Sequence, residues 1–161
     1  MLITACSHDA STAPSLPVAD LGTCTNLQTP DGTTLAAHAF ATGVQIYRWN
    51  DTSWVFVSPS AVLTTDAART DMIAIHYSGP TWQSIGGDKV VASAANSCKA
   101  TPDAIPWLLL NATTVAANGP FAGVKYIQRL NTAGGLAPST PGTKSGEVAS
   151  VAYTAEYFFY R

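Results

Sequence analysis

Charged side chains are scarce in this sequence, and their scarcity excludes several kinds of partner. Asp, Glu, Lys and Arg make up 11% of the 161 residues, against 47% hydrophobic residues, and the formal net charge is −2. Eight basic residues scattered along the chain cannot provide the dense phosphate contacts of a nucleic-acid-binding protein. They also cannot form a polybasic membrane-binding patch. We therefore expect no nucleic-acid partner.

Catalytic and cofactor motifs are missing as well. The sequence holds no Gly-x-Ser-x-Gly elbow, no Gly-rich phosphate loop and no Gly-x-Gly-x-x-Gly segment opening a helix. The three histidines, His8, His38 and His76, are far apart and show no metal-ligand spacing. We expect no metal site and no cofactor, and whether the protein is an enzyme stays open.

No segment predicts a convincing amphipathic helix. Residues 59–70, PSAVLTTDAART, offer at most one or two helical turns, starting near Pro59. A nucleotide-dependent dehydrogenase needs parallel strands joined by helical crossovers. The lack of helices therefore argues against an NAD-dependent enzyme.

Short alternating segments fill most of the chain instead. Residues 43–58 predict a β-hairpin around the turn formers NDTS, and residues 81–94 predict a second one around GGD. The apolar run of residues 106–114, PWLLLNATT, is typical of a strand buried on both faces. A long aromatic strand, residues 148–161, ends the chain. About eight strands separated by Gly, Pro and Asn turns predict one all-β domain over residues 28–161, an antiparallel β-sandwich or β-barrel.

Cysteine is rare, and the position of the first one indicates export. Residues 2–6, LITAC, resemble the lipobox that ends a bacterial lipoprotein signal peptide, which would place a lipid on Cys6. The apolar stretch before Cys6 is short for a complete signal, which leaves open whether the start is truncated. Residues 1–27 are interpreted as this lipobox-like start and a flexible, proline-rich tether. The protein would then be secreted or held in the bacterial cell envelope, attached to the membrane only through Cys6.

Cys24 and Cys98 remain as an even pair once Cys6 is set aside, and they predict one disulfide. Closing a loop of that length contributes about 4 kcal/mol of stability in the chain-entropy model. A chance ITAC sequence with two buried thiols is the alternative interpretation.

Polar residues inside apolar strands are the best candidates for a site. His76 lies near the end of the segment MIAIHY, and SGPTW follows directly, so Trp82 lies close to His76 in sequence. A neutral imidazole in a cleft can act as an acid or a base, since its reference pKa is about 6.5. A histidine that only bonds a backbone carbonyl at a strand end is the structural alternative.

Arg129 lies in the middle of the predicted strand over residues 124–131, VKYIQRLN. If its side chain points inward it needs a partner, and Glu156 is the candidate for a structural ion pair. The functional alternative is that Arg129 binds the carboxylate of a substrate through the paired N–H donors of its guanidinium. If its side chain points outward, Arg129 is an ordinary solvated residue.

The same strand ends abruptly in the segment TAGGLAP, which suggests the mouth of a binding site. Its glycines would let a ligand approach the backbone, with His76 and Trp82 on the opposite side. A tight turn beside a buried polar contact is the alternative. The ligand-binding candidates in this segment are Gln128, Arg129, Asn131, Thr132, Gly134 and Gly135.

Several blocks of the sequence resemble one known family. The blocks FATGVQIYRW, IAIHYSGPTWQS and GPFAGVKYIQRLNTAGGLAP, among others, make residues 28–161 similar to secreted fungal and bacterial proteins catalogued as a domain of unknown function. The resemblance implies export and one β-rich domain, but no general activity. Some fungal members are labelled malate dehydrogenase, a label that does not describe this chain because no dinucleotide site can be located.

Three functions stay open at this point. The first is a binding module that holds a small organic or carbohydrate ligand in an aromatic-lined cleft. The second is a structural or surface interaction protein without a pocket. The third is a lyase, isomerase or hydrolase that uses His76 and Arg129 in acid/base chemistry.

Overall fold

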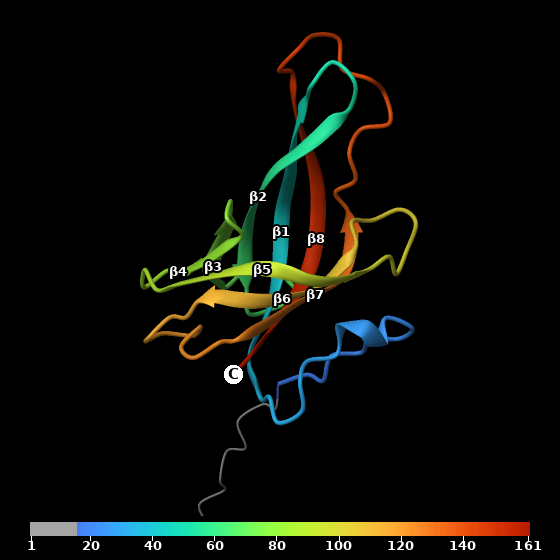
Figure 1. Ribbon diagram of the computed structural model, residues 1–161. Coiled ribbons are helices and arrows are strands. Elements are labelled where there is room, and N and C mark those ends of the chain that lie inside the picture. Colours follow the sequence, from blue (N-terminus) through green and yellow to red (C-terminus); the bar gives the residue numbers. More distant parts are fainter. Residues whose placement is uncertain (1–15) are drawn as a thin grey trace, which may run out of the picture.

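The structure is a closed barrel of eight antiparallel strands in which each strand pairs with its neighbours in sequence and β8 pairs with β1 (Figure 1). This computed structural model describes residues 16–161, so Cys6 and His8 lie outside the described residues. The described residues include no helix with the length and hydropathy that a membrane span requires. The elements are η1 (Thr25–Leu27), β1 (Leu35–Trp49), β2 (Trp54–Thr64), β3 (Met72–Tyr77), β4 (Thr81–Ser84), β5 (Lys89–Cys98), β6 (Trp107–Thr114), β7 (Tyr126–Gly134) and β8 (Val148–Tyr160).

The all-β prediction is confirmed, and of its two architectures the chain adopts the barrel. Both predicted hairpins form, as β1 with β2 and as β4 with β5. The one or two helical turns that the sequence allowed near Pro59 do not form, because β2 continues through this segment to Thr64. Ala61 and Leu63 face the barrel interior, and β2 bonds to strands on both sides. Tertiary pairing thus overrides a weak local preference.

Alternate residues of the strands point into the barrel, as the period of two requires. In β8 the buried inward residues are Tyr153, Ala155, Tyr157 and Phe159, and in the neighbouring strand β1 they include Ala39 and Ala41. Ala39 lies opposite Tyr157 in the register. Small side chains on one strand therefore leave room for large aromatic rings on the next.

β1 and β2 approach each other unusually closely at Gly43. A Cβ added to this glycine would lie 2.5 Å from the Cα of Ala61 and closer still to the carbonyl oxygen of Ser60. Both neighbours are backbone atoms of β2, which cannot rotate away. Glycine is required here by close packing of two strands.

A disulfide fastens the segment before β1 to the outside of the barrel. Cys24 and Cys98 are bonded, with their Cα atoms 5.7 Å apart, as predicted from the cysteine count. Cys24 and Leu27 are fully buried in a second apolar cluster with Leu109, Leu130 and Phe158 on the outer face of the sheet. Residues 21–27, which the sequence interpretation assigned to the tether, therefore lie packed against the domain. The outer cluster covers one face of β6 and the barrel core covers the other, which explains why its sequence is a continuous apolar run.

Candidate functional site

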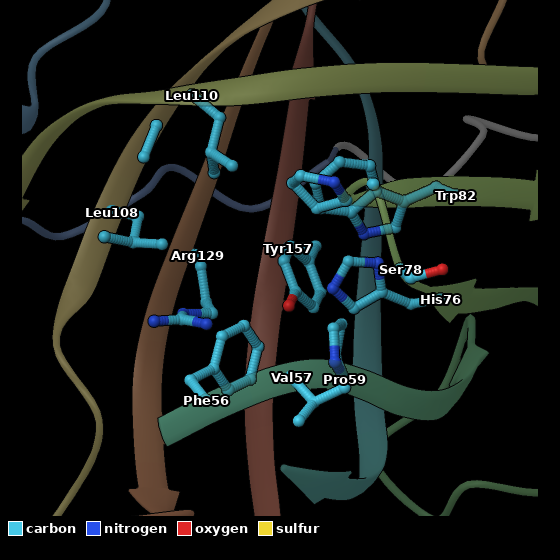
Figure 2. Close-up of a pocket in the computed structure, with 13 residues that line it drawn as sticks. Phe56, Val57, Pro59, His76, Ser78, Trp82, Leu108, Leu110, Arg129 and Tyr157 are labelled. Atoms are coloured by element: carbon cyan, nitrogen blue, oxygen red, sulfur yellow. The ribbon is translucent and has the colours of Figure 1, made fainter. Parts of the chain in front are cut away.

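A cavity of about 250 Å³ enters the barrel and opens to solvent beside Phe56 and Val57, which are both about half exposed. Most of its wall is apolar. Its polar side chains are His76, Trp82, Arg129 and Tyr157, from β3, β4, β7 and β8, and Ser78 from the turn between β3 and β4 (Figure 2). The lining residues are Phe56, Val57, Pro59, His76, Ser78, Gly79, Pro80, Trp82, Ala94, Leu108, Leu110, Arg129 and Tyr157.

His76 is held in a fixed position by one hydrogen bond and two aromatic contacts. Its Nδ1 lies 2.9 Å from the carbonyl oxygen of Thr81. Because a carbonyl only accepts, Nδ1 carries the proton and Nε2 of the neutral ring is an acceptor. The imidazole stacks on Trp82 with the ring centres 4.3 Å apart, and meets the edge of Tyr157 at 5.3 Å. Burial lowers the pKa of His76 to about 4, so the ring is neutral at pH 7.

One buried polar atom of a lining residue, Nε1 of Trp82, has no hydrogen-bond partner within residues 16–161. The hydroxyl of Tyr157 lies against the Tyr153 hydroxyl and the Arg129 guanidinium, with which it hydrogen-bonds in looser geometry than a standard bond. Both side chains are 1% exposed. Buried polar groups are almost always paired, and an orphan costs about 1–3 kcal/mol. Burial raises the pKa of Tyr157 above its ordinary value, opposed by the charge of Arg129, so the hydroxyl keeps its proton and can donate.

Arg129 brings a positive charge to the same cavity. Its guanidinium donates from Nη2 and Nε to the carbonyl oxygen of Pro106, at 2.8 and 3.3 Å. Figure 2 shows the guanidinium on the side of the cavity toward which the Tyr157 hydroxyl points, with Phe56 nearby. A guanidinium has five N–H donors, so several remain for a ligand.

The predicted ion pair between Arg129 and Glu156 is not formed. In the register of β7 with β8, Arg129 lies opposite Tyr157 and Leu130 lies opposite Glu156, so the two charged side chains point to opposite faces. Glu156 is on the outer face, where its carboxylate lies 2.8 Å from Nε2 of His38 and accepts a hydrogen bond from Asn131. The prediction assumed that the two side chains shared a face.

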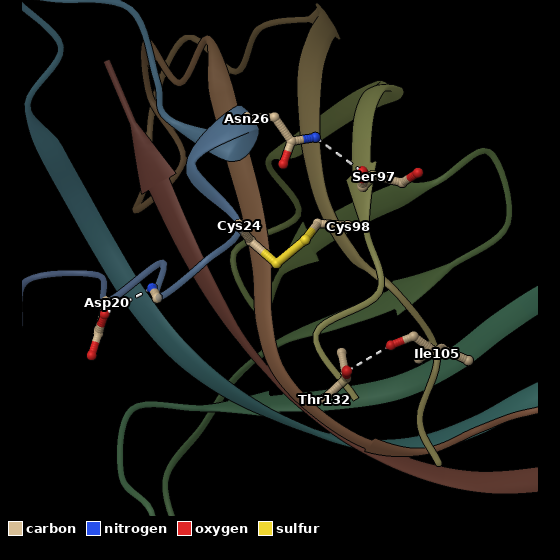
Figure 3. Close-up of a disulfide and its surroundings, with 8 residues drawn as sticks. Asp20, Cys24, Asn26, Ser97, Cys98, Ile105 and Thr132 are labelled. Atoms are coloured by element: carbon tan, nitrogen blue, oxygen red, sulfur yellow. Dashed lines mark hydrogen bonds between the residues drawn. A yellow bond between two sulfur atoms is a disulfide. The ribbon is translucent and has the colours of Figure 1, made fainter. Parts of the chain in front are cut away.

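The other candidates from the segment after Arg129 do not line this cavity. Gln128 points outward, donates to the carbonyl oxygen of Leu27 at 2.7 Å and accepts from the hydroxyl of Tyr160. Thr132 is buried and donates to the carbonyl oxygen of Ile105 at 2.6 Å (Figure 3). These contacts match the structural alternative, a turn beside buried polar groups.

The two glycines and Asn131 form an irregular end to β7. Asn131 has a φ of 50° at a register shift between β7 and β8. A Cβ on Gly134 would lie 2.7 Å from the carbonyl oxygen of Ala152, and one on Gly135 would lie 2.9 Å from Cβ of Tyr153. The glycines therefore let the chain approach β8, where Gly135 also accepts a 2.6 Å bond from the hydroxyl of Tyr47.

Tyr157 is the functional candidate that sequence reasoning missed. It stood among many aromatic residues of the predicted strands, and its spacing alone does not separate it from core tyrosines. Gln45 and Tyr153 are further inward polar residues: the Gln45 side-chain nitrogen has no partner in the described part of the chain, and the Tyr153 hydroxyl interacts with that of Tyr157. One available signal was the alternation of β8, which places Tyr153, Tyr157 and Phe159 on the same face.

Metal ligands do not gather anywhere in residues 16–161, where no three His, Cys, Asp or Glu side chains form a group that could hold an ion.

No curated protein and no solved structure matches the chain. A family model described as "Protein of unknown function (DUF3455)" matches residues 30–161, which is the barrel without most of the segment before β1. The chain therefore belongs to the DUF3455 family of proteins of unknown function.

Proposed function

We propose that this barrel binds a small organic molecule in this partly open cavity. The observation that carries the proposal is a mostly apolar wall that holds two polar groups without a matching partner in residues 16–161: the Arg129 guanidinium, which has no acidic partner, and the Trp82 indole N–H. Ligand sites are typically concave and apolar, with a few polar groups placed to orient the ligand. His76 and Arg129 are two of the polar groups on the wall that could orient a ligand.

A purely structural barrel is the weaker alternative. Water covers the mostly apolar wall of the cavity of about 250 Å³ when no ligand is bound, which costs free energy that an apolar ligand would recover. The Trp82 indole N–H, which has no partner in residues 16–161, also departs from the rule that buried donors are paired. A barrel with a purely structural role needs neither feature.

Binding is also favoured over acid/base catalysis. An effective general base has a pKa near the working pH, whereas burial lowers the pKa of His76 to about 4. Its Nδ1 proton is engaged by the carbonyl of Thr81. His76 is therefore better suited to accept a hydrogen bond from a ligand than to take its proton.

Export and lipid attachment are part of the proposal. The Cys24–Cys98 bond supports export, because structural disulfides persist in oxidising compartments. The lipid anchor at Cys6 rests on the sequence alone. Intact-mass analysis of the full chain from a bacterial host tests it: we expect a lipidated fragment that starts at Cys6. An unmodified full-length chain in the cytosol would contradict this.

A thermal-shift screen of the full chain against sugars, organic acids and neutral aromatic compounds tests ligand binding. A ligand at about one hundred times its Kd adds about 2.7 kcal/mol to the free energy of unfolding. For a domain of this size the melting temperature should then rise by roughly 5–10 °C. A flat screen across all classes would contradict the proposed function.

Matched tyrosine variants show where a hit binds. Tyr157→Phe removes a hydroxyl whose contacts with Tyr153 and Arg129 fall short of standard hydrogen bonds, so the empty variant should lose little stability while the ligand-induced shift falls. Tyr160→Phe is the control, because this hydroxyl bonds Gln128 on the outer face and its loss should leave the ligand-induced shift unchanged. The reverse pattern would place the ligand outside the cavity.

A further inference from the structure

The polar groups of the cavity are unbalanced, because nearly all of them are donors. Arg129, the Trp82 indole N–H and the Tyr157 hydroxyl can donate, and His76 Nε2 is the principal side-chain acceptor. No Asp or Glu is among the lining residues. A ligand that satisfies this wall must therefore supply acceptors.

The charge of Arg129 is also unmatched within residues 16–161. The ion pair found there joins His38 to Glu156 on the outer face. The Arg129 guanidinium donates to the carbonyl oxygen of Pro106 and also interacts with the Tyr157 hydroxyl, and both of these groups are neutral. A charge beside apolar walls is stabilised by an anion of opposite sign, and a planar guanidinium suits the two oxygens of a carboxylate.

The remaining space limits the size of the ligand. An apolar cavity of about 150 Å³ is large enough to hold benzene. The cavity of about 250 Å³ therefore has room for one ring with a short substituent. Phe56, Leu108, Leu110 and the stacked Trp82 supply apolar and aromatic surface for such a body.

We propose that the ligand is a monocarboxylate with a single-ring apolar body, whose carboxylate binds Arg129 and the Tyr157 hydroxyl and whose ring packs against Trp82 and Leu110. This inference rests on the proposed function, since it names the ligand class of the same cavity. It assigns Arg129 the role of selecting acids over neutral compounds of the same shape.

Titration calorimetry with matched acids and amides tests the inference on the full chain at pH 7. The pairs are benzoate with benzamide and 3-phenylpropanoate with 3-phenylpropanamide, which share a body and differ in charge. Hydrogen bonds to charged groups predict that the acid of a pair binds roughly ten- to a hundredfold more tightly than its amide. Arg129→Gln should remove this preference and leave the weak amide binding in place.

Arg48→Gln is the matched control, because Arg48 is exposed on the outer face of β1 and should leave acid binding unchanged. Unfolding curves of both variants establish that each is folded before binding is compared. If an acid and its amide bind wild type equally, or if Arg129→Gln keeps the preference for the acid, the carboxylate inference is overturned. In those cases the proposed binding function still stands. If no compound of any class binds, both proposals fail.

Discussion

The buried imidazole of His76 should make the stability of the barrel depend on pH in a defined window. In the unfolded chain the imidazole has its ordinary pKa of 6.5, whereas burial in the folded barrel lowers it to about 4. Between these values the unfolded state binds more protons than the folded state, so stability falls as the pH falls. The contribution is fully present above pH 6.5 and is lost progressively down to pH 4.

The size of the effect follows from the difference between the two pKa values. Each pKa unit corresponds to about 1.4 kcal/mol, so the shift predicts a loss of about 3 kcal/mol on going from pH 8 to pH 4. His76→Asn is the informative variant, because an amide N–H can still donate to the carbonyl of Thr81 while the group does not titrate. Carboxylates and the other histidines titrate equally in both proteins and cancel in the comparison.

Urea unfolding of wild type and His76→Asn at half-unit steps from pH 8 to pH 4 measures the effect. We expect the smaller side chain to lower stability by a constant amount at high pH. The two curves should then converge by about 3 kcal/mol as the pH falls to 4, because only wild type loses the His76 contribution. Parallel curves would show that His76 titrates alike in the folded and unfolded states, and would refute the reasoning from its burial.

Three further predictions concern the frame around the cavity, each measured by urea unfolding at pH 7. Replacing both Cys24 and Cys98 by Ala should lower the free energy of unfolding by about 4 kcal/mol, because the bond closes a loop across a sequence separation of 74; a loss below about 1 kcal/mol would contradict this entropic account. Gly43→Ala should lower the free energy of unfolding by at least about 1–3 kcal/mol, because the added Cβ meets backbone atoms of β2. Gly86→Ala is the control. Its added Cβ comes no closer than 3.5 Å to side-chain atoms, so the free energy of unfolding should change little. Thr132→Val should cost about 1–3 kcal/mol by leaving a buried carbonyl without its donor, and an unchanged midpoint would mean that water replaces the hydroxyl.

Much of the fold was predictable because it is encoded in short stretches. The hairpins around residues 50–53 and 86–88 follow from turn formers between alternating segments. The pairing of Cys24 with Cys98 followed from the cysteine count. The segment after Pro59 was misjudged, because its apolar residues suit a strand only when β1 and β3 lie on either side.

The candidate site was predictable only in part. His76, Trp82 and Arg129 were singled out as polar or aromatic residues in apolar strands, and they do meet at one cavity. Gln128 and Asn131 were grouped with Arg129 because they are close in sequence. In a strand, however, Gln128 must point away from its neighbour, and the irregularity at Asn131 changes the alternation again.

The sequence by itself determined that the chain alternates with a period of two, carries little charge and forms about eight strands with one disulfide. Only the tertiary structure decided which face of each strand is the interior, because alternation defines two faces but not their surroundings. Closure of β8 onto β1 turns one face of all eight strands inward. That closure places Arg129 beside Tyr157 and leaves Glu156 outside, so a charge that looked paired along the sequence faces an apolar cavity instead.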